Sequence, residues 1–249
     1  ANLWTDDAAD AIDRHGYYGG GTEMEPWHQL FVGPVSTGSM LTGPGQGVFH
    51  KAALQVADKP MMMSEWTSSP PNRQKLEAVP MFGFYGMGLY GWDASTHFAG
   101  GHAWFDGGWP DWGIWGGQTP HHLGQFFAVS RAVHEGHIQE GDPAAALHFT
   151  EEEISSGVDV RPTVDPWLAA IGPQTVSFAP GSSEVLSVDD YRDGNFIEST
   201  TGELSWNTDG YFLIKTDRTQ GVVGAAGGLT LELPDITVEL NTEFVSLLF

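Results

Sequence analysis

Short runs in which apolar and polar residues alternate dominate the chain from about residue 173 onward. Gly, Pro, Asn and Asp, the usual turn-forming residues, separate these runs. Short, closely spaced strands with turn signals predict an antiparallel sandwich or barrel. The expected strands cover residues 176–178, 184–188, 210–216, 221–224, 229–233 and 236–240, with a last apolar strand within 242–249.

The first part of the chain instead alternates strand-like apolar runs with helix-like stretches. Strand-like runs cover residues 11–18, 60–66 and 81–93, and helices are expected at 6–12, 48–56, 73–79 and 124–135. Strands joined by helical crossovers imply a parallel sheet. A (β/α) barrel displays its active site on polar residues at the C-terminal ends of such strands. We therefore expect an α/β fold, part of a (β/α) barrel, followed by an antiparallel β-sandwich.

Composition also changes along the chain. All ten histidines lie between His15 and His148, and all seven methionines precede Gly88. The change falls near the acidic run 151–153. A shift of this kind suggests two domains. We expect a partial barrel over residues 1–150 and a β-sandwich over 151–249, which could itself be truncated.

The charge balance excludes several partners. Asp and Glu number 32 against 10 Lys and Arg, giving a net charge of −22. Nucleic acids and anionic membranes both need a basic face, so neither is expected as a partner. The absence of cysteine excludes disulfides and thiolate metal sites. Residues 1–7 lack the basic and apolar regions of a signal peptide. We nevertheless expect a secreted or periplasmic protein, whose leader could have been removed.

Glu65 is the strongest single candidate for a catalytic residue. It follows three consecutive methionines, so its strand is expected to be buried on both faces. A carboxylate that ends such a strand emerges where a barrel holds its active site. Partial burial balanced by neighbouring donors suits a carboxylate nucleophile or a general acid. The alternative is a glutamate that caps a helix or lies on the surface at a strand end.

Three segments carry a family resemblance. Residues 60–66 (Pro-Met-Met-Met-Ser-Glu-Trp) and 84–93 (Phe-Tyr-Gly-Met-Gly-Leu-Tyr-Gly-Trp-Asp) resemble the seventh and eighth barrel strands of clan A retaining glycoside hydrolases. Residues 13–17 (Asp-Arg-His-Gly-Tyr) resemble the sixth strand. The resemblance covers roughly residues 1–140 and fits agarase-like, β-galactosidase-like and endoglucanase-like relatives. The strands that follow resemble the accessory β-sandwich found after many such barrels.

The resemblance implies roles for individual residues. The glutamate on strand seven of that clan is the nucleophile, which implies this role for Glu65. A tryptophan ending strand eight floors the sugar subsite, which implies this role for Trp92. A histidine or tyrosine after strand six contacts the substrate or the nucleophile, which implies this role for His15 or Tyr17. No cofactor is implied.

The second carboxylate of such an enzyme is missing from the pattern. A retaining glycosidase needs two carboxyl groups about 5–5.5 Å apart. The clan's acid/base follows an asparagine on strand four, and this chain has no Asn-Glu pair. Glu25 precedes Glu65 by too few residues for three βα units, each roughly 30 residues long. We therefore expect strands one to five and the acid/base glutamate to lie outside this chain, in a missing N-terminal half or a second chain that completes the barrel. Half a barrel leaves strand edges uncovered, so the chain alone should be poorly stable.

A loop over residues 94–122 adds candidate sugar-binding groups. Its tryptophans can stack on sugar rings and its Asp and His side chains can bind hydroxyls, although the tryptophans could instead only pack the loop. A zinc site at His97, His102, His121 and His122 is an alternative, but no two of them have a helical i, i+4 spacing, so no metal is expected. The expected substrate-binding residues are His15, Tyr17, Trp66, Trp92, Asp93, Trp109 and Trp112.

These observations favour a retaining glycoside hydrolase that acts on a β-linked polysaccharide or oligosaccharide, with a carbohydrate as its partner. Two alternatives stay open. The chain could be a non-catalytic carbohydrate-binding protein or an inactive fragment, in which Glu65 is incidental. It could also be a purely structural acidic surface protein, which would bind no glycan.

Overall fold

The fold is known from a computed structural model that describes residues 2–25, 30–36, 38–44, 54–69, 75–98, 120–157 and 164–249. The chain is mixed α/β with four sheets among these residues. In the same residues no helix is both long and apolar enough to cross a membrane.

The first sheet has the strand order β2-β1-β4-β5 and contains two of the three expected parallel strands, at 11–18 and 60–66. β1 (Ile12–Glu25), β4 (Met61–Ser69) and β5 (Ala94–His97) run parallel, and β2 (Leu30–Ser36) returns antiparallel along β1. The sheet is open, with β2 and β5 at its edges, so no barrel closes within the described residues.

The third strand, expected at residues 81–93, is wrong over its whole length. Residues 81–89 form a π-helical segment, η3 (Met81–Leu89), and the strand β5 begins only at Ala94. η3 is buried almost all round, and an apolar run without one-sided periodicity reads equally well as strand or helix. Its glycines permit the close packing. A Cβ on Gly83 would lie 2.1 Å from Val129, and one on Gly86 would lie 2.5 Å from the Trp92 ring.

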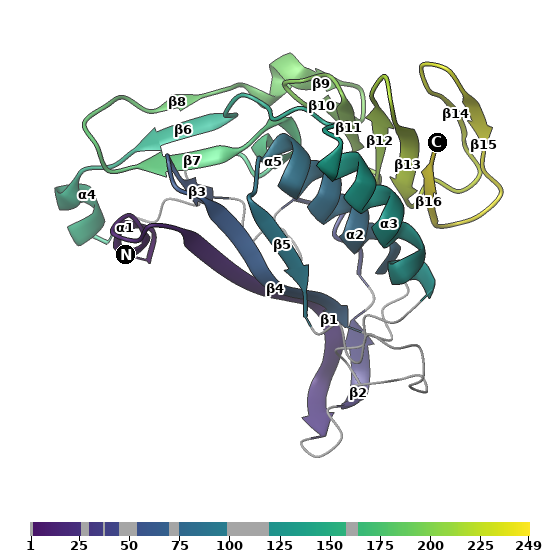
Figure 1. Cartoon of the computed structure of the whole chain (residues 1–249), viewed down its shortest axis with the longest axis horizontal. Helices are drawn as coiled ribbons and strands as arrows, with labels where there is room; N and C mark the ends of the chain where they lie inside the picture. The colour runs from purple at the N-terminus through teal and green to yellow at the C-terminus, as the bar shows by residue number, and fades with distance from the viewer. Residues whose placement is uncertain are drawn as a thin grey trace.

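Helices cover one face of the parallel sheet. This layer consists of η2 (Lys75–Glu77), α2 (Ala78–Pro80), η3 and α3 (Pro120–His134), which Figure 1 shows together on one side of the strands. The Trp66 ring of β4 stacks on Phe82 of η3 at 4.3 Å. The helix expected at 124–135 is confirmed by α3, and the helix expected at 73–79 is confirmed over the described residues 75–79, as η2 and the start of α2. The helix expected at 6–12 lies earlier, at α1 (Asn2–Asp6), and the end of the 48–56 stretch is a strand, β3 (Leu54–Val56).

A second sheet joins the two parts of the chain. Its order is β3-β7-β6-β8, with β6 (Ala145–His148), β7 (Gln174–Ser177) and β8 (Glu184–Val185). β3 pairs directly with β7, so the packing has no boundary at residue 150. The acidic run 151–153 is instead the first turn of α4 (Glu151–Ser155), where Thr150 and Glu153 form a capping box and negative charge suits the helix N-terminus. α5 (Leu168–Ile171) precedes β7.

Six of the remaining strands form an antiparallel sheet, in the order β16-β13-β12-β11-β10-β9. The runs expected at 176–178 and 184–188 as part of the sandwich belong instead to the second sheet, where β7 pairs in parallel with β3 and β6. The strands are β9 (Arg192–Asp193), β10 (Phe196–Glu198), β11 (Leu204–Asn207), β12 (Tyr211–Lys215), β13 (Gln220–Gly224) and β16 (Val245–Leu248), and the 3-10 turn η6 (Val188–Tyr191) precedes them.

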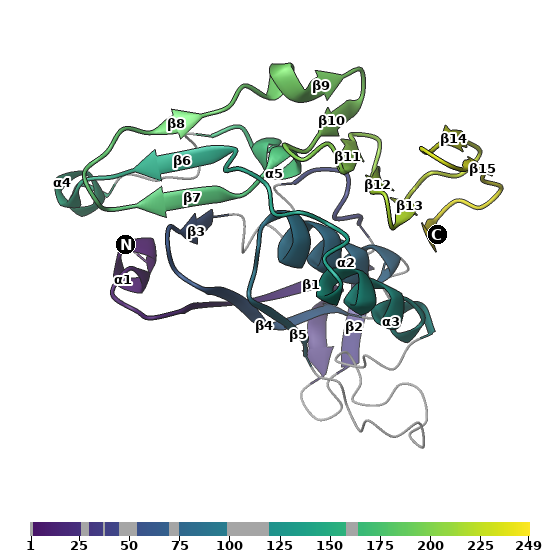
Figure 2. The ribbon, with the colours of Figure 1, turned by 45° about the horizontal axis from the view of Figure 1, so that its top comes forward.

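This sheet lies between two unlike layers (Figure 2). On one face, Trp206 and Phe212 pack against Tyr85 of η3, with ring centroids 5.2 and 5.3 Å away. The other face is covered by a hairpin of β14 (Thr230–Glu232) and β15 (Thr237–Glu239), over a separate small cluster that includes Tyr211 and Leu213. The larger hydrophobic core contains residues from both sides of residue 150.

Candidate functional site

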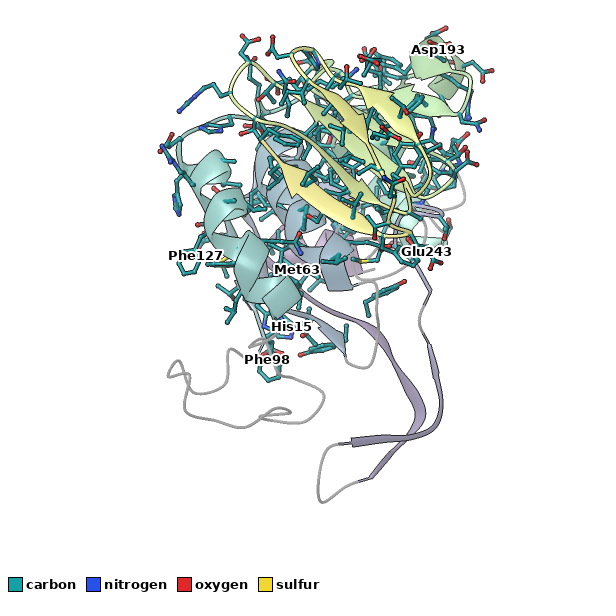
Figure 3. The ribbon with its side chains drawn as sticks, turned by 90° about the vertical axis from the view of Figure 1, so that its right-hand side faces the viewer. His15, Met63, Phe98, Phe127, Asp193 and Glu243 are labelled. Atoms are coloured by element: carbon teal, nitrogen blue, oxygen red, sulfur yellow. The ribbon has the colours of Figure 1, made fainter. Side chains whose placement is uncertain are left out.

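The face of the parallel sheet that points away from the helices carries polar side chains. Asp13, His15 and Tyr17 alternate along β1, so all three lie on one face, and all are exposed, whereas Ile12 and Tyr18 are buried. We call the surface formed by Asp13, His15, Tyr17, Ser64 and Glu65 the open face. In Figure 3, Met63 lies near the helices, and His15 and Phe98 are labelled close together below it.

A β-bulge in β4 brings Ser64 and Glu65 onto this face. Asp13 pairs with Met62 and His15 with Glu65, so β4 advances three residues while β1 advances two. The pairing with β5 shows the same extra residue in β4, between Met63 and Trp66. Regular alternation would place Glu65 on the face of Met61 and Met63. The bulge returns Trp66 to that buried face and leaves Glu65 half-buried beside His15.

Two side chains of β1 contact one oxygen of Glu65. The Tyr17 hydroxyl donates a hydrogen bond to Oε2 at 2.5 Å, and Nδ1 of His15 lies 3.4 Å from the same oxygen. The Glu65 side chain is 33% exposed and that of His15 is 48% exposed. Within the described residues Oε1 makes no hydrogen bond. The arrangement holds the carboxylate through Oε2, while the Glu65 side chain stays partly exposed.

Tyr17 is a stable hydrogen-bond donor. Burial, the hydrogen bond to Glu65 and the negative charge of Glu65 raise the pKa of Tyr17 to about 12. The phenol therefore keeps its proton at neutral pH and donates a hydrogen bond to the carboxylate. The Phe98 ring, which follows β5, stands edge-on to Tyr17 with centroids 6.1 Å apart.

Asp13 binds the residue that precedes Glu65. Its Oδ1 accepts a hydrogen bond from the Ser64 amide at 3.0 Å, and its Oδ2 accepts one from the Ser64 hydroxyl at 2.6 Å. Nε2 of His15 lies 3.2 Å from Oδ2. Partial burial would raise the pKa of Asp13, but the bonds from Ser64 and the neighbouring His15 outweigh it and lower that pKa. Asp13 is therefore an acceptor at neutral pH.

Trp92 does not lie beside Glu65, contrary to the expectation from the resemblance. It precedes β5, whose first residue pairs with Met62, so it lies at the N-terminal end of the parallel strands. It is only 2% exposed and packs against Phe82 and Tyr90. A side chain buried there cannot floor a sugar subsite beside Glu65. Glu65 itself lies in the middle of β4, and not at its end as the sequence predicts.

Trp66 and Asp93 also have structural contacts in place of the expected substrate-binding role. Trp66 is 4% exposed and its indole nitrogen donates to the Ser95 hydroxyl at 2.9 Å. Asp93 joins the beginnings of two strands, because its Oδ2 accepts from the Met61 amide at 2.9 Å. Trp109 and Trp112 lie outside the described residues.

Two histidines of the Trp-rich loop region meet at the end of the sheet. The rings of His97 and His122 lie 4.2 Å apart, and His97 Nε2 is 2.7 Å from the Thr67 hydroxyl. In the described part of the chain, no group of three or more His, Asp or Glu side chains could hold a metal ion. His102 lies outside this part.

The structure thus brings together His15, Tyr17 and Glu65, and adds Asp13, Ser64 and Phe98, which sequence reasoning did not select. The alternation of Asp13, His15 and Tyr17 in β1 was a readable signal for Asp13. The parts played by Ser64 and Phe98 depend on the bulge and on the true position of β5, which no local pattern reveals.

Comparison of the chain with known proteins finds no matching family model, no similar curated protein and no similar solved structure. The functional argument therefore rests on the geometry of the open face.

Proposed function

We propose that the chain carries the nucleophile of a retaining β-glycosidase, and that this nucleophile is Glu65. The observation that supports the proposal most strongly is the Glu65 carboxylate on the open face, bound at Oε2 by the Tyr17 hydroxyl and next to His15. A carboxylate nucleophile has to be held in place and reachable by the substrate, and a Glu65 side chain that is bound at Oε2 and 33% exposed supports this role.

In the proposed reaction, Oε1 of Glu65 attacks the anomeric carbon as the bond to the leaving oxygen breaks. That oxygen takes a proton from a general acid, and a covalent glycosyl-enzyme forms. The same acid/base then removes a proton from water, which attacks the anomeric carbon and releases Glu65. We take this acid/base to be a glutamate outside this chain, as the family resemblance implies. Asp13 does not suit the role, because its lowered pKa keeps it ionised.

Neutral β-linked polysaccharide or oligosaccharide is the substrate class we propose. The open face presents two carboxylates, Asp13 and Glu65, and the chain has a net charge of −22, both of which disfavour an anionic sugar. The Tyr17 ring is 42% exposed, and together with Phe98 it offers an aromatic surface for the apolar face of a sugar. A polymer of this kind is degraded outside the cytoplasm, so we propose a secreted or periplasmic location.

The test is covalent trapping with 2,4-dinitrophenyl 2-deoxy-2-fluoro-β-glycosides of glucose, galactose, mannose and xylose. The dinitrophenolate leaves without protonation, so trapping needs the nucleophile and not the acid/base. The proposal predicts a covalent adduct with at least one sugar, on the peptide that contains Glu65. Glu65→Gln should form no adduct. Glu184→Gln, an exposed glutamate on β8, is the matched control and should react like the unaltered protein.

Two outcomes would contradict the proposal. One is an adduct on another residue. The other is no adduct with any of the four sugars, on protein shown by circular dichroism to be folded.

A carbohydrate-binding protein without catalysis is the second candidate, and the contact between the exposed Tyr17 and the half-buried Phe98 favours it. It predicts retarded migration in native gels containing a β-linked polysaccharide, without any covalent adduct. Retardation should then persist in Glu65→Gln and decrease in Phe98→Ala.

A further inference from the structure

We propose that Asp13 is a positioning residue for the Glu65 nucleophile, acting by clamping the β4 bulge at Ser64 and by orienting the His15 ring. This inference rests on the proposed function of Glu65. It concerns a side chain that does not touch Glu65 itself in any described contact.

The clamp begins with the main chain of Ser64. A bulge interrupts the regular ladder of hydrogen bonds, so its main-chain groups need other partners. Side chains from the two neighbouring strands supply them. Asp13 of β1 accepts from the Ser64 amide at 3.0 Å, and the Thr96 hydroxyl of β5 donates to the Ser64 carbonyl. The residue immediately before Glu65 is therefore held from both sides.

The second oxygen of Asp13 serves two further donors. Oδ2 accepts from the Ser64 hydroxyl at 2.6 Å and lies 3.2 Å from Nε2 of His15. Nε2 is also 3.2 Å from the Ser64 hydroxyl oxygen. With Nε2 directed at Asp13, the other ring nitrogen, Nδ1, is directed at Oε2 of Glu65, 3.4 Å away. One carboxylate thus orients both the backbone that carries Glu65 and the ring that stands beside it.

The geometry separates this role from acid/base catalysis. Both oxygens of Asp13 are occupied by donors, and its lowered pKa keeps it ionised, so it has no proton to give. Replacing a single acceptor oxygen by an amide nitrogen should release the Ser64 hydroxyl or His15 while keeping the size of the side chain. Asp13→Asn is therefore the informative variant.

The experiment measures trapping kinetics with the reactive 2-fluoro glycoside, separating the inactivation rate constant from the dissociation constant of the reagent. Asp13→Asn should lower the rate constant about 10- to 100-fold, the cost of misplacing a reacting group by about 1 Å. The dissociation constant should stay within about twofold, because Asp13 touches no part of the sugar surface at Tyr17. Asp10→Asn makes the same charge change at an exposed position just before β1 and should change neither value.

Ser64→Ala keeps the proposal testable if Asp13→Asn fails to fold. It removes only the hydroxyl that Asp13 and His15 share, so by itself it should lower the inactivation rate constant, and a normal rate constant would overturn the proposal. Where Asp13→Asn folds, the two substitutions can be combined. If the clamp acts as a unit, the inactivation rate constant of the combined variant should be no lower than that of the more impaired single variant, since the effects of contacting residues in one network are not additive. Additive losses would show that the two residues act independently and would overturn the proposal.

A second readout does not depend on turnover. Hydrogen exchange of the Ser64 amide should be slow in the unaltered protein and at least tenfold faster in Asp13→Asn, but unchanged in Asp10→Asn. Normal trapping by Asp13→Asn with an unchanged Ser64 amide would overturn the role of Asp13 and leave the proposed function standing. Failure of the unaltered protein to form any adduct would instead overturn the proposed function, and the positioning role with it.

Discussion

The two faces of the β1-β4-β5 sheet are built from the same strands but carry opposite chemistry. Toward the helices, β4 presents Met61, Met63 and Trp66, all buried in the hydrophobic core. Toward the open face, it presents Ser64 and Glu65 among polar partners from β1. The single extra residue in β4 makes both possible, because it restores the apolar sequence to the core after two successive polar side chains have faced outward.

The side chains that stabilise the fold and those of the candidate site therefore lie on opposite faces of one sheet. Side chains on the helical face should therefore affect unfolding far more than trapping. Side chains on the open face should do the reverse. This separation can be tested by substitutions on each face.

Trp66→Ala should destabilise the protein by about 3–5 kcal/mol, the usual cost of truncating a buried tryptophan. The indole stacks on Phe82 and donates to Ser95, so its loss opens a cavity and leaves the serine without that donor. Urea unfolding followed by circular dichroism measures the change. A loss below about 1 kcal/mol would show that the helical face does not hold the sheet as described.

Glu77 is a carboxylate buried on the helical side, in contrast to Asp13 and Glu65 on the open face. Burial raises its pKa to about 7, although the Ser39 hydroxyl and the Met40 amide donate hydrogen bonds to it and oppose the rise. A group whose pKa is raised on folding contributes stability below its unfolded pKa, near 4.5, and loses it as pH rises through about 7. The free energy of unfolding should therefore fall by up to about 3 kcal/mol from this group over that range.

Glu77→Gln should remove this part of the pH dependence, as measured by urea unfolding at a series of pH values between those limits. A profile that keeps its fall with pH in Glu77→Gln would contradict the assignment of this pH dependence to the buried carboxylate.

Tyr17→Phe should have the smallest effect on stability, within about 0.5 kcal/mol, because the side chain is exposed. It removes the donor to Oε2 of Glu65, so the inactivation rate constant should fall about tenfold, the equivalent of about 1.4 kcal/mol. Trapping kinetics and urea unfolding on the same preparation check both values. A large loss of stability with normal trapping would reverse the assignment of Tyr17 to the open face.

Much of the fold could be predicted from the sequence where side chains alternate in burial. Alternation predicted β14 and β15, in which only the middle residue is buried. β12 and β13 were predicted as short runs between turn residues, although both of their faces are buried. The alternation failed at η3, where glycines and apolar residues are buried on all sides and give no period. That error moved the third parallel strand and placed Trp92 at the wrong end of the sheet.

The candidate site was predictable only in part for a related reason. His15, Tyr17 and Glu65 could be selected because each lies within a short motif. The role of Ser64 and Asp13 could not, because a bulge is a property of the register between strands and leaves no mark in the sequence of one strand. The charge run at 151–153 indicated a boundary, but it is a helix N-terminus, where local electrostatics explains the acidity.

Mass analysis of the Glu65 peptide after reaction with the 2-fluoro glycosides is the most direct test of Glu65 as a nucleophile. A covalent sugar is expected on Glu65 in the unaltered protein and in Glu184→Gln, and none in Glu65→Gln. Folded protein that carries no adduct with any of the four sugars, or an adduct that survives in Glu65→Gln, would contradict that role.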